Sequence, residues 1–327
     1  GLIEGRERVY YSMGHDSRFD ERVMDWVKVI RAKAKLGAQP PGEFLVLDHL
    51  LHELRLIKSK HEIELMQRAA EISAEGHRQA MAVCAPGVHE FTLEAELNYA
   101  FTRGGSRAPA YNSIVAAGEN ACILHYDRND AEVKDGDLIL IDAGCEYKYY
   151  ASDITRTFPA NGTFNPQQKA IYELVLKAQD SAIDAVQPGA PWDAPHNASV
   201  RVITQGLIKL GLIEGTLAKA IKAEAYRDFY MHRVGHWIGI DVHDVGDYKI
   251  DEKWRLLEPG MVTTIEPGIY IAPDNKRVPK KWRGIGVRIE DDVLVTKNGN
   301  RVLTTGIPKT VAEIETFMAQ AKQKRAA

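Results

Sequence analysis

The spacing of hydrophobic residues predicts several amphipathic helices. Apolar side chains at Ile63, Met66 and Ala70 recur every three or four residues, which predicts a long helix over residues 58–84. Pro86 and Gly87 end this helix, and a second helix follows over about residues 90–103. Similar patterns predict helices over residues 20–33, 165–186 and 193–210, and from about 309 onward.

Short apolar runs between these helices predict strands. They are VYYS near the start, then NSIVAAG, ACILHY, DLILIDAGC and ASDITRTF after residue 112, and later MVTTIEPGIYI and GIGVRIEDDVLV. Helices followed by strand pairs occur twice, which indicates an internal duplication of an αββ unit. The pattern therefore predicts an α+β protein, with a domain boundary near residues 50–58 after the breaker cluster AQPPGE.

Asp142 and Asp153 come close together if the strands that carry them form a hairpin. Side chains alternate across a strand, so Asp142 lies on an otherwise apolar face of DLILIDAGC. A tight hairpin turning at Tyr147 and Lys148 would place Asp142 directly opposite Asp153, with Cβ atoms about 4.5–5.5 Å apart. Two bare carboxylates at this distance repel each other, so one takes a proton or both hold a cation.

A second pair of strands carries acidic residues in the same way. Thr264 and Glu266 share a face of MVTTIEPG, and Arg288, Glu290 and Asp292 share a face of GIGVRIEDD. Ordinary strand-end acids beside turns explain either pair alone. Two such pairs, with four carboxylates facing one point, predict a site for more than one cation.

The stretch HRVGHWIGIDVHD, residues 232–244, holds three of the eleven histidines. It lacks the glutamate of the HExxH zinc motif. Its glycines and β-branched residues predict a strand or extended loop rather than a helix. His232 and His236 share a strand face, and a bend at Gly239 would bring His243 back toward them. Together with His125, these residues favour a proton-handling site over isolated packed histidines.

Composition and charge argue against several classes of protein. The 327 residues are 45% hydrophobic and 27% charged, and the net charge of −3 comes from mixed signs, which argues against a nucleic-acid surface. No apolar run reaches the roughly 18 residues that span a bilayer. Cys84, Cys122 and Cys145 fit neither a disulfide framework nor a zinc ribbon, which predicts a reducing, cytoplasmic location. The apolar neighbours of Cys145 indicate a packed strand residue rather than a nucleophile.

His125, Asp142, Asp153 and the motifs HRVGHWIGIDVHDVG, EPGIYI and GIGVRIEDD together resemble the M24 metallopeptidases, which have the pita-bread fold. GDLILIDAGCEYKYYASDITRTFP and EPGIYIAPD are similar to motifs of the bacterial aminopeptidase P group within this family. The resemblance covers about residues 58–320. It implies a pita-bread fold with pseudo-duplicated αββ halves over residues 58–327, preceded by the tail and linker of a truncated N-terminal domain at 1–57.

The resemblance also implies a dinuclear metal site and a reaction. The implied ligands are Asp142, Asp153, His236, Glu266 and Glu290, with Asp153 and Glu290 bridging two divalent ions. An oxygen-rich set favours Mn²⁺, with Co²⁺, Zn²⁺ or Fe²⁺ as alternatives. A hydroxide bridging the ions would hydrolyse the N-terminal bond before proline, and Glu266 would act as general base and then acid.

Further implied residues surround this site. Substrate would contact His125, His232, His243 and Tyr270. His243 would donate to the scissile carbonyl, while His125 and His232 would hold the proline side. Arg288 is similar to a family residue that pairs with Tyr270, and its strand position would let it orient Glu290; an ordinary surface residue is the alternative. The implied partners are peptides with proline at the second position, without nucleic acid or membrane.

Several alternatives stay open at this point. A prolidase would share every ligand but would cleave only dipeptides that end in proline. A methionine aminopeptidase fits the histidine stretch less well, and a non-catalytic binding protein of the same fold would lack ligands. Arg233 stands where bacterial members of the family usually have glycine, which questions the details of the substrate pocket. The oligomeric state is also open, a homo-oligomer included.

Overall fold

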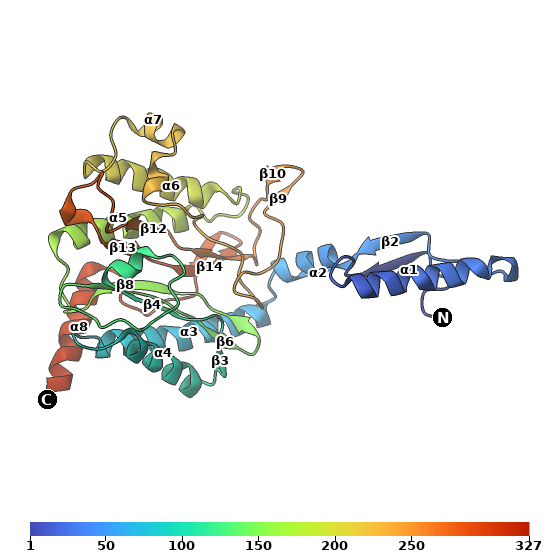
Figure 1. The fold of residues 1–327 in the computed structure, drawn as a ribbon, viewed down its shortest axis with the longest axis horizontal. Helices are drawn as coiled ribbons and strands as arrows, with labels where there is room; N and C mark the ends of the chain where they lie inside the picture. Colours follow the sequence, from blue (N-terminus) through green and yellow to red (C-terminus); the bar gives the residue numbers. More distant parts are fainter. Residues whose placement is uncertain (327) are drawn as a thin grey trace. The chain divides into compact units, whose positions relative to one another are not determined.

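The computed structural model describes residues 1–326, which form two compact units, Gly1–Arg55 and the described residues from Leu56 onward (Figure 1). The first unit is a βαβ arrangement, in which α1 (Ser17–Ala32) connects the parallel strands β1 (Arg8–Tyr11) and β2 (Glu43–Val46). A short 3₁₀ turn, η1 (Ala34–Leu36), follows α1. Whether residues 1–57 are the tail of a longer domain stays a prediction.

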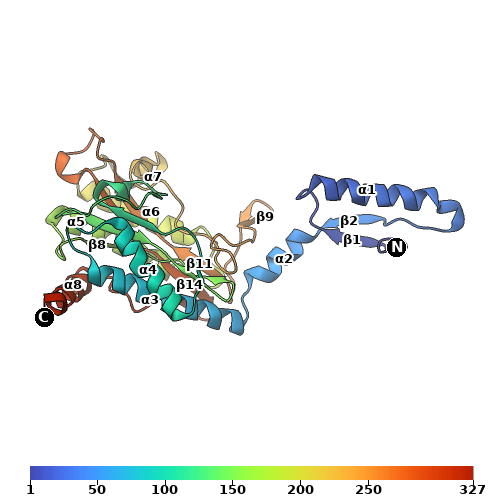
Figure 2. The ribbon, with the colours of Figure 1, turned by 60° about the horizontal axis from the view of Figure 1, so that its bottom comes forward.

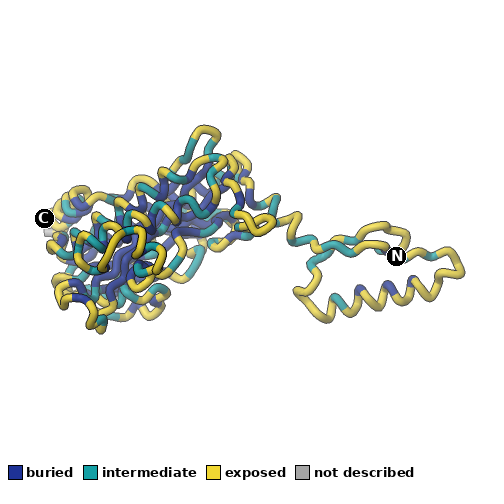
Figure 3. The backbone as a smooth tube through the Cα atoms, turned by 90° about the horizontal axis from the view of Figure 1, so that it is seen from above, coloured by how far each residue is buried: buried dark blue, intermediate teal, exposed yellow. Residues whose placement is uncertain are grey.

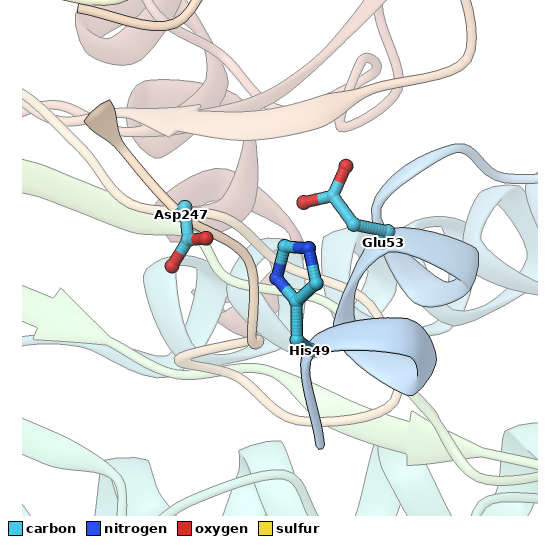
Figure 4. A group of neighbouring side chains, drawn as sticks. All are labelled: His49, Glu53 and Asp247. Atoms are coloured by element: carbon cyan, nitrogen blue, oxygen red, sulfur yellow. The ribbon is translucent and has the colours of Figure 1, made fainter. Parts of the chain in front are cut away.

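Helix α1 begins where its sequence predicts. The side chain of Asp16 caps it by accepting hydrogen bonds from the backbone N–H groups of Arg18 and Phe19. One face of the helix is buried in the first unit through Val23, Val27 and Ile30, which follow helical spacing. Helix α2 (Leu47–Leu56) follows β2 directly, and His49 and Glu53 lie one turn apart on it (Figure 4).

The second unit places its strands between two pairs of helices. α3 packs against α4 on one side, and α5 packs against α6 on the other (Figures 1 and 2). A capping box starts α3, because Ser59 accepts from the N–H of Glu62 while Glu62 accepts from the N–H of Ser59. The helices of this unit are α3 (Lys60–Val83), α4 (Glu90–Gly104), α5 (Pro166–Asp184), α6 (Ala194–Lys209), α7 (Leu217–Lys222) and α8 (Val311–Ala326).

The strands form small antiparallel sheets, β4-β5-β8, β11-β14-β15, β3-β6-β7, β12-β13 and β9-β10. Their bounds are β3 (Ala108–Pro109), β4 (Ile114–Ala117), β5 (Leu138–Asp142), β6 (Cys145–Tyr147), β7 (Tyr150–Ala151), β8 (Thr155–Pro159), β9 (Lys249–Ile250), β10 (Lys253–Trp254), β11 (Val262–Ile265), β12 (Gly268–Ile271), β13 (Ile285–Arg288), β14 (Asp291–Thr296) and β15 (Gly299–Val302). The 3₁₀ turns are η2 (Gly118–Cys122), η3 (Ala225–Asp228) and η4 (Lys280–Trp282).

The α+β prediction is confirmed, and so is its repeated organisation. One half runs from α3 and α4 into β4, β5 and β8, while the other runs from α5 and α6 into β11, β14 and β15. Buried backbone is concentrated in the strands between the helices (Figure 3). No helix within residues 1–326 is both long enough and apolar enough to cross a membrane.

The predicted hairpin register between Asp142 and Asp153 is wrong by two residues. β6 and β7 turn at Lys148 and Tyr149, both with positive φ, instead of at Tyr147 and Lys148. Asp142 therefore pairs with Thr155 in the β5–β8 ladder rather than with Asp153. The turn carries no glycine or asparagine that would have marked its position.

Three predicted strands also differ from the structure. ACILHY is no strand, because η2 covers its first two residues and a turn follows. The two long strands of the second half are each broken in the middle, at Glu266–Pro267 and at Ile289–Glu290. The ladders on both sides of the breaks keep one register, with Ile265 opposite Asp291 and Gly268 opposite Arg288. Continuing that register places Glu266 opposite Glu290.

A buried ion pair ties the two halves together. Arg156 of β8 donates through Nη2 to Asp291 Oδ1 of β14 at 2.7 Å, and through Nη1 to the carbonyl oxygen of Glu290 at 2.6 Å. Arg156 and Asp291 are both about 1% exposed. The pair therefore lies one residue away from the strand ends that carry Thr155 and Glu290.

Removing the Arg156 guanidinium should strongly destabilise the second unit. The Arg156→Ala variant leaves a buried carboxylate without its main partner, and we expect the free energy of unfolding to fall by about 3 kcal/mol. Arg128→Ala is the matched control, because its ion pair with Asp130 is exposed and should contribute less than about 1 kcal/mol. Urea unfolding followed by circular dichroism measures both; equal losses would contradict the linking role of Arg156.

Candidate functional site

The candidate site is a cavity of about 580 Å³ in the second unit. Every residue predicted from the sequence for this site lines it except Tyr270, which lies behind the wall and reaches it through His232 and Arg288. The residues it brings together are Asp142, Asp153, His236, Glu266, Glu290, His125, His232, His243 and Arg288.

Asp142 and Asp153 lie close together although they are not cross-strand partners. Both accept a hydrogen bond from the phenol of Tyr111, at 2.6 Å for Asp142 Oδ1 and at a shorter distance for Asp153. The backbone N–H of Asp153 donates to Asp292 Oδ2 at 3.1 Å, which fixes the chain there. The proximity predicted from strand parity is therefore present, through a different geometry.

His236 presents one ring nitrogen to these carboxylates. Its Nδ1 lies 2.9 Å from the carbonyl oxygen of Trp237, and a carbonyl only accepts, so Nδ1 carries a proton. Nε2 then faces Asp153 Oδ2 at 3.5 Å and Glu266 Oε1 at 3.6 Å. A backbone carbonyl that holds the distal nitrogen is the usual way in which proteins orient a metal-binding histidine.

Glu290 completes the cluster from the second half of the unit. One ligand atom each from Asp153, His236 and Glu290 lies within 4.8 Å of the other two, which is close enough for all three to hold one ion. Thr155 Oγ1 donates to Glu290 Oε2 at 2.6 Å, so the first half positions a carboxylate of the second. The donor set of carboxylate oxygens and one imidazole fits hard or borderline divalent cations.

The crowded carboxylates shift one another's pKa values. Burial, followed by repulsion from Asp153, Glu266 and Asp142, raises the pKa of Glu290 well above its ordinary value. Burial raises the pKa of Glu266 to about 7 despite the attraction of His236. Burial alone would lower the pKa of His236, but Asp153 and Glu266 overcome it and raise this pKa to about 9. Without a cation, the cluster therefore retains protons at neutral pH.

Arg288 neutralises a different carboxylate from the one predicted. It is 4% exposed, so it is no surface residue, and its Nη2 donates to Asp142 Oδ2 at 2.6 Å rather than to Glu290. Arg288 acts on Glu290 through Thr155: Arg288 Nε donates to Thr155 Oγ1 at 3.2 Å, and that hydroxyl donates to Glu290 Oε2 at 2.6 Å. Arg288 Nη1 also donates to the phenol oxygen of Tyr270 at 3.0 Å, as the predicted pairing requires.

Tyr270 connects Arg288 to His232. The Nδ1 of His232 lies 2.7 Å from the carbonyl oxygen of Arg233 and so carries a proton. Burial, together with the charge of Arg288, lowers the pKa of His232 to about 3, so the ring is neutral and Nε2 accepts from Tyr270 Oη at 2.9 Å. Both nitrogens of His232 are thus engaged, and the ring offers its carbon edge and its face to the cavity.

The other two histidines keep polar edges available at the cavity. His243 packs edge-on against His236, with ring centroids 4.3 Å apart. Burial, together with His236, lowers the pKa of His243, so a neutral imidazole with one N–H donor is favoured. His125 follows η2 and is exposed at the cavity wall.

The histidine stretch is an extended loop held against β11, as predicted. The backbone N–H of Thr264 donates to the carbonyl of His236, and the N–H of Glu266 donates to the carbonyl of Val234. A Cβ at Gly235 would lie 1.9 Å from the carbonyl oxygen of Thr264, so only glycine allows this approach. Bends from Gly239 onward return His243 to His236, which confirms the predicted convergence.

Two residues of the site were not predicted from the sequence. Tyr111 lies in a loop before β4 and bonds two carboxylates, and Thr155 bonds Glu290. Thr155 shares a strand face with Asp153 in ASDITRTF, which is a signal that could have found it. Nothing in the loop sequence around Tyr111 marks it, because its role comes from a contact with residues more than thirty positions away.

Comparison with known proteins places this geometry among proteases. Residues 64–297 match the model of metallopeptidase family M24. The chain is 45% identical to the Xaa-Pro aminopeptidase of Escherichia coli over 323 residues, which are 99% of this chain and 73% of that protein. It is 54% identical to the Xaa-Pro aminopeptidase of Haemophilus influenzae over 277 residues, which are 85% of this chain and 64% of that protein.

Solved structures of aminopeptidases superimpose closely on this structure. The Pseudomonas aeruginosa aminopeptidase PepP superimposes with a TM-score of 0.96 at 66% identity, over 99% of this chain and 73% of that chain. A zinc-substituted Escherichia coli aminopeptidase P in complex with product superimposes with a TM-score of 0.93 at 45% identity, over 98% and 72% of the two chains. The predicted pita-bread fold is thereby confirmed.

Stabilisation by added metal should increase with pH. The folded, metal-free protein holds protons on Glu266 and His236, whose pKa values of about 7 and 9 exceed the unfolded values of 4.5 and 6.5. Their contribution to stability is complete below the unfolded values and is lost as pH rises through the folded ones. A divalent ion displaces the same protons, so it binds more weakly at low pH.

The measurement is the gain in Tm when a fixed concentration of Mn²⁺ is added to EDTA-stripped protein at about pH 5.5 and pH 8.5. We expect a distinctly larger gain at the higher pH. An equal gain at both pH values would mean that these two groups do not exchange protons for metal.

Proposed function

The chain belongs to metallopeptidase family M24, and from this premise we propose that it is a dinuclear metal-dependent aminopeptidase that hydrolyses the N-terminal Xaa-Pro bond of peptides. The observation that carries the proposal is the convergence of four carboxylates and His236 in one cavity whose wall also presents neutral histidines. Both relatives described above bear the name Xaa-Pro aminopeptidase.

We assign Asp142, Asp153, His236, Glu266 and Glu290 as the residues that hold two divalent ions. Four carboxylates can balance the charge of two such ions, and their hard oxygens favour Mn²⁺. When bound, a pair of ions supplies Lewis acidity and lowers the pKa of a water molecule. Asp153, His236 and Glu290 would hold an ion together, because one ligand atom from each lies within 4.8 Å of the other two.

Glu266 is the residue that moves the proton. It lies at the break between β11 and β12, where it lines the cavity with Oε1 3.6 Å from Nε2 of His236. We assign it to accept the proton of the attacking water and deliver it to the leaving nitrogen. His243 donates its N–H to the scissile carbonyl as negative charge develops there.

A peptide bond before proline needs a specialised site, because its nitrogen carries no hydrogen to donate. The carbon edge of His232 suits the apolar pyrrolidine ring, since both of its nitrogens are engaged elsewhere. His125 faces the same cavity and completes the proline side. Tyr270 donates to Nε2 of His232 and so holds the ring in its tautomer, while Arg288 opposes the rise that burial causes in the pKa of Asp142; both act through their neighbours.

The proposal includes a reducing, cytoplasmic location. Cys84, Cys122 and Cys145 are free thiols. Burial raises the pKa values of Cys84 and Cys122 to about 12, so these thiols are also poor nucleophiles. Cys145 is fully buried in β6, in keeping with a packing role.

The function is tested with a matched pair of substrates. Wild-type protein with Mn²⁺ should release alanine from the tripeptide Ala-Pro-Ala, and removal of metal by EDTA should abolish the release. Asp153→Ala should lower kcat by at least about a thousandfold while the far-UV circular dichroism stays native, because a metal ligand is lost. Cleavage of Ala-Pro but not of Ala-Pro-Ala would identify a prolidase instead, and full activity in EDTA would refute a metallopeptidase.

His243→Ala separates catalysis from metal binding, because alanine has no donor to replace the imidazole N–H. Loss of a donor to a developing oxyanion typically costs about a hundredfold in kcat. We expect a loss of this size with the metal content of the protein unchanged, measured by steady-state kinetics and by elemental analysis. A parallel loss of metal and activity would instead make His243 a ligand.

A further inference from the structure

Two cations gather on one tryptophan near the cavity. The guanidinium carbon of Arg233 lies 5.3 Å from the ring centroid of Trp254, and Lys249 Nζ lies 4.7 Å from it. Both distances fall within the range of cation–π contacts. Trp254 is half-buried and packs against Trp192 at 5.8 Å between centroids, while Lys249 is its cross-strand partner in the β9–β10 hairpin. The packed indole ring is therefore a rigid surface on which both cations lie.

Neither cation is matched by an acidic side chain. Within residues 1–326, Arg233 and Lys249 form no ion pair with a carboxylate, unlike Arg227, which pairs with Glu224, and Arg277, which pairs with Asp228. Both side chains are exposed, so each cation remains open to a ligand. Two like charges on one ring repel each other, and an anion bound between or beside them relieves that repulsion.

Arg233 also belongs to the wall of the cavity that holds the metal ligands, directly after His232. A short peptide has a positive amino end and a negative carboxyl end. The cations at Trp254 repel the first and attract the second, whereas the acidic cluster, balanced by bound cations or protons, does not oppose this orientation. Charge alone thus favours the orientation in which the amino end lies at the acidic cluster and the carboxyl end lies at Arg233.

We propose that Arg233 and Lys249, held on Trp254, form a subsite for a carboxylate that follows proline in the substrate. The inference rests on the function proposed above and adds a preference to it. The carboxylate is the C-terminus of a short peptide or an acidic side chain in a longer one. The planar guanidinium can donate two parallel hydrogen bonds to either.

The experiment compares Ala-Pro-Ala with its C-terminal amide, Ala-Pro-Ala-NH₂, in wild type and Arg233→Met. Methionine keeps the packing on Trp254 but removes the charge. We expect wild type to favour the free acid in kcat/KM by up to about fivefold, as for an exposed ion pair, mainly through KM. In Arg233→Met the ratio of acid to amide should fall to about one, and in Lys249→Met it should fall part of the way.

Arg233→Lys should keep most of the preference, and 0.5 M salt should reduce it in wild type. Arg277→Met is the control, because that guanidinium pairs with Asp228 and does not line the cavity; its ratio should match wild type. Comparing Ala-Pro-Glu-NH₂ with Ala-Pro-Gln-NH₂ identifies the source of the carboxylate. Faster cleavage of the glutamate peptide would show that the subsite also accepts acidic side chains. Equal rates for the two peptides would show that it accepts only the C-terminal carboxylate.

The two proposals fail in different ways. If wild type cleaves both the acid and the amide but Arg233→Met leaves their ratio unchanged, the subsite is refuted and the aminopeptidase stands. If wild type with Mn²⁺ cleaves neither peptide, the proposed function fails and the subsite fails with it.

Discussion

Mutual repulsion among four buried or half-buried carboxylates is the constraint on which the second unit depends. Asp142, Asp153, Glu266 and Glu290 share one cavity, where removal from water makes each negative charge costly. The protein offsets part of this cost with the guanidinium of Arg288 and the phenol of Tyr111. The rest is left for protons or cations, which is why the site behaves as a cation receptor.

The same constraint explains why the two halves of the fold must interlock. Thr155 of the first half positions Glu290 of the second, and Arg288 of the second half neutralises Asp142 of the first. Arg156, next to Thr155, makes a further contact between the halves by donating to Asp291 and to the carbonyl oxygen of Glu290. Each half thus supplies a hydrogen-bond donor or a positive charge to a carboxylate of the other half. The duplicated architecture brings these contacts together at one cavity.

Strand alternation marked Asp142 as an acid on an apolar strand face and grouped Glu266 and Glu290 on the faces of a second strand pair, whereas the full set of ligands came from the family resemblance. The pairing register of the strands could not be predicted from the same alternation. Lys148 and Tyr149 adopt positive φ without a glycine to mark the turn. Pro267 does mark the first break in the sequence, but no proline marks the second break, at Ile289–Glu290. Tyr111 was missed because its partners are distant in sequence, and Arg288 was assigned to Glu290 because parity identifies a shared face without identifying the contact.

The division of the ligands between the halves has a consequence for biosynthesis. Asp142 and Asp153 leave the ribosome long before Glu266 and Glu290, so the nascent chain carries an acidic pair without Arg288 to neutralise it. Thr155, which positions Glu290, and Asp142, which receives Arg288, are likewise made before their partners. The set of five residues assigned above is therefore complete only after the last strands have been synthesised.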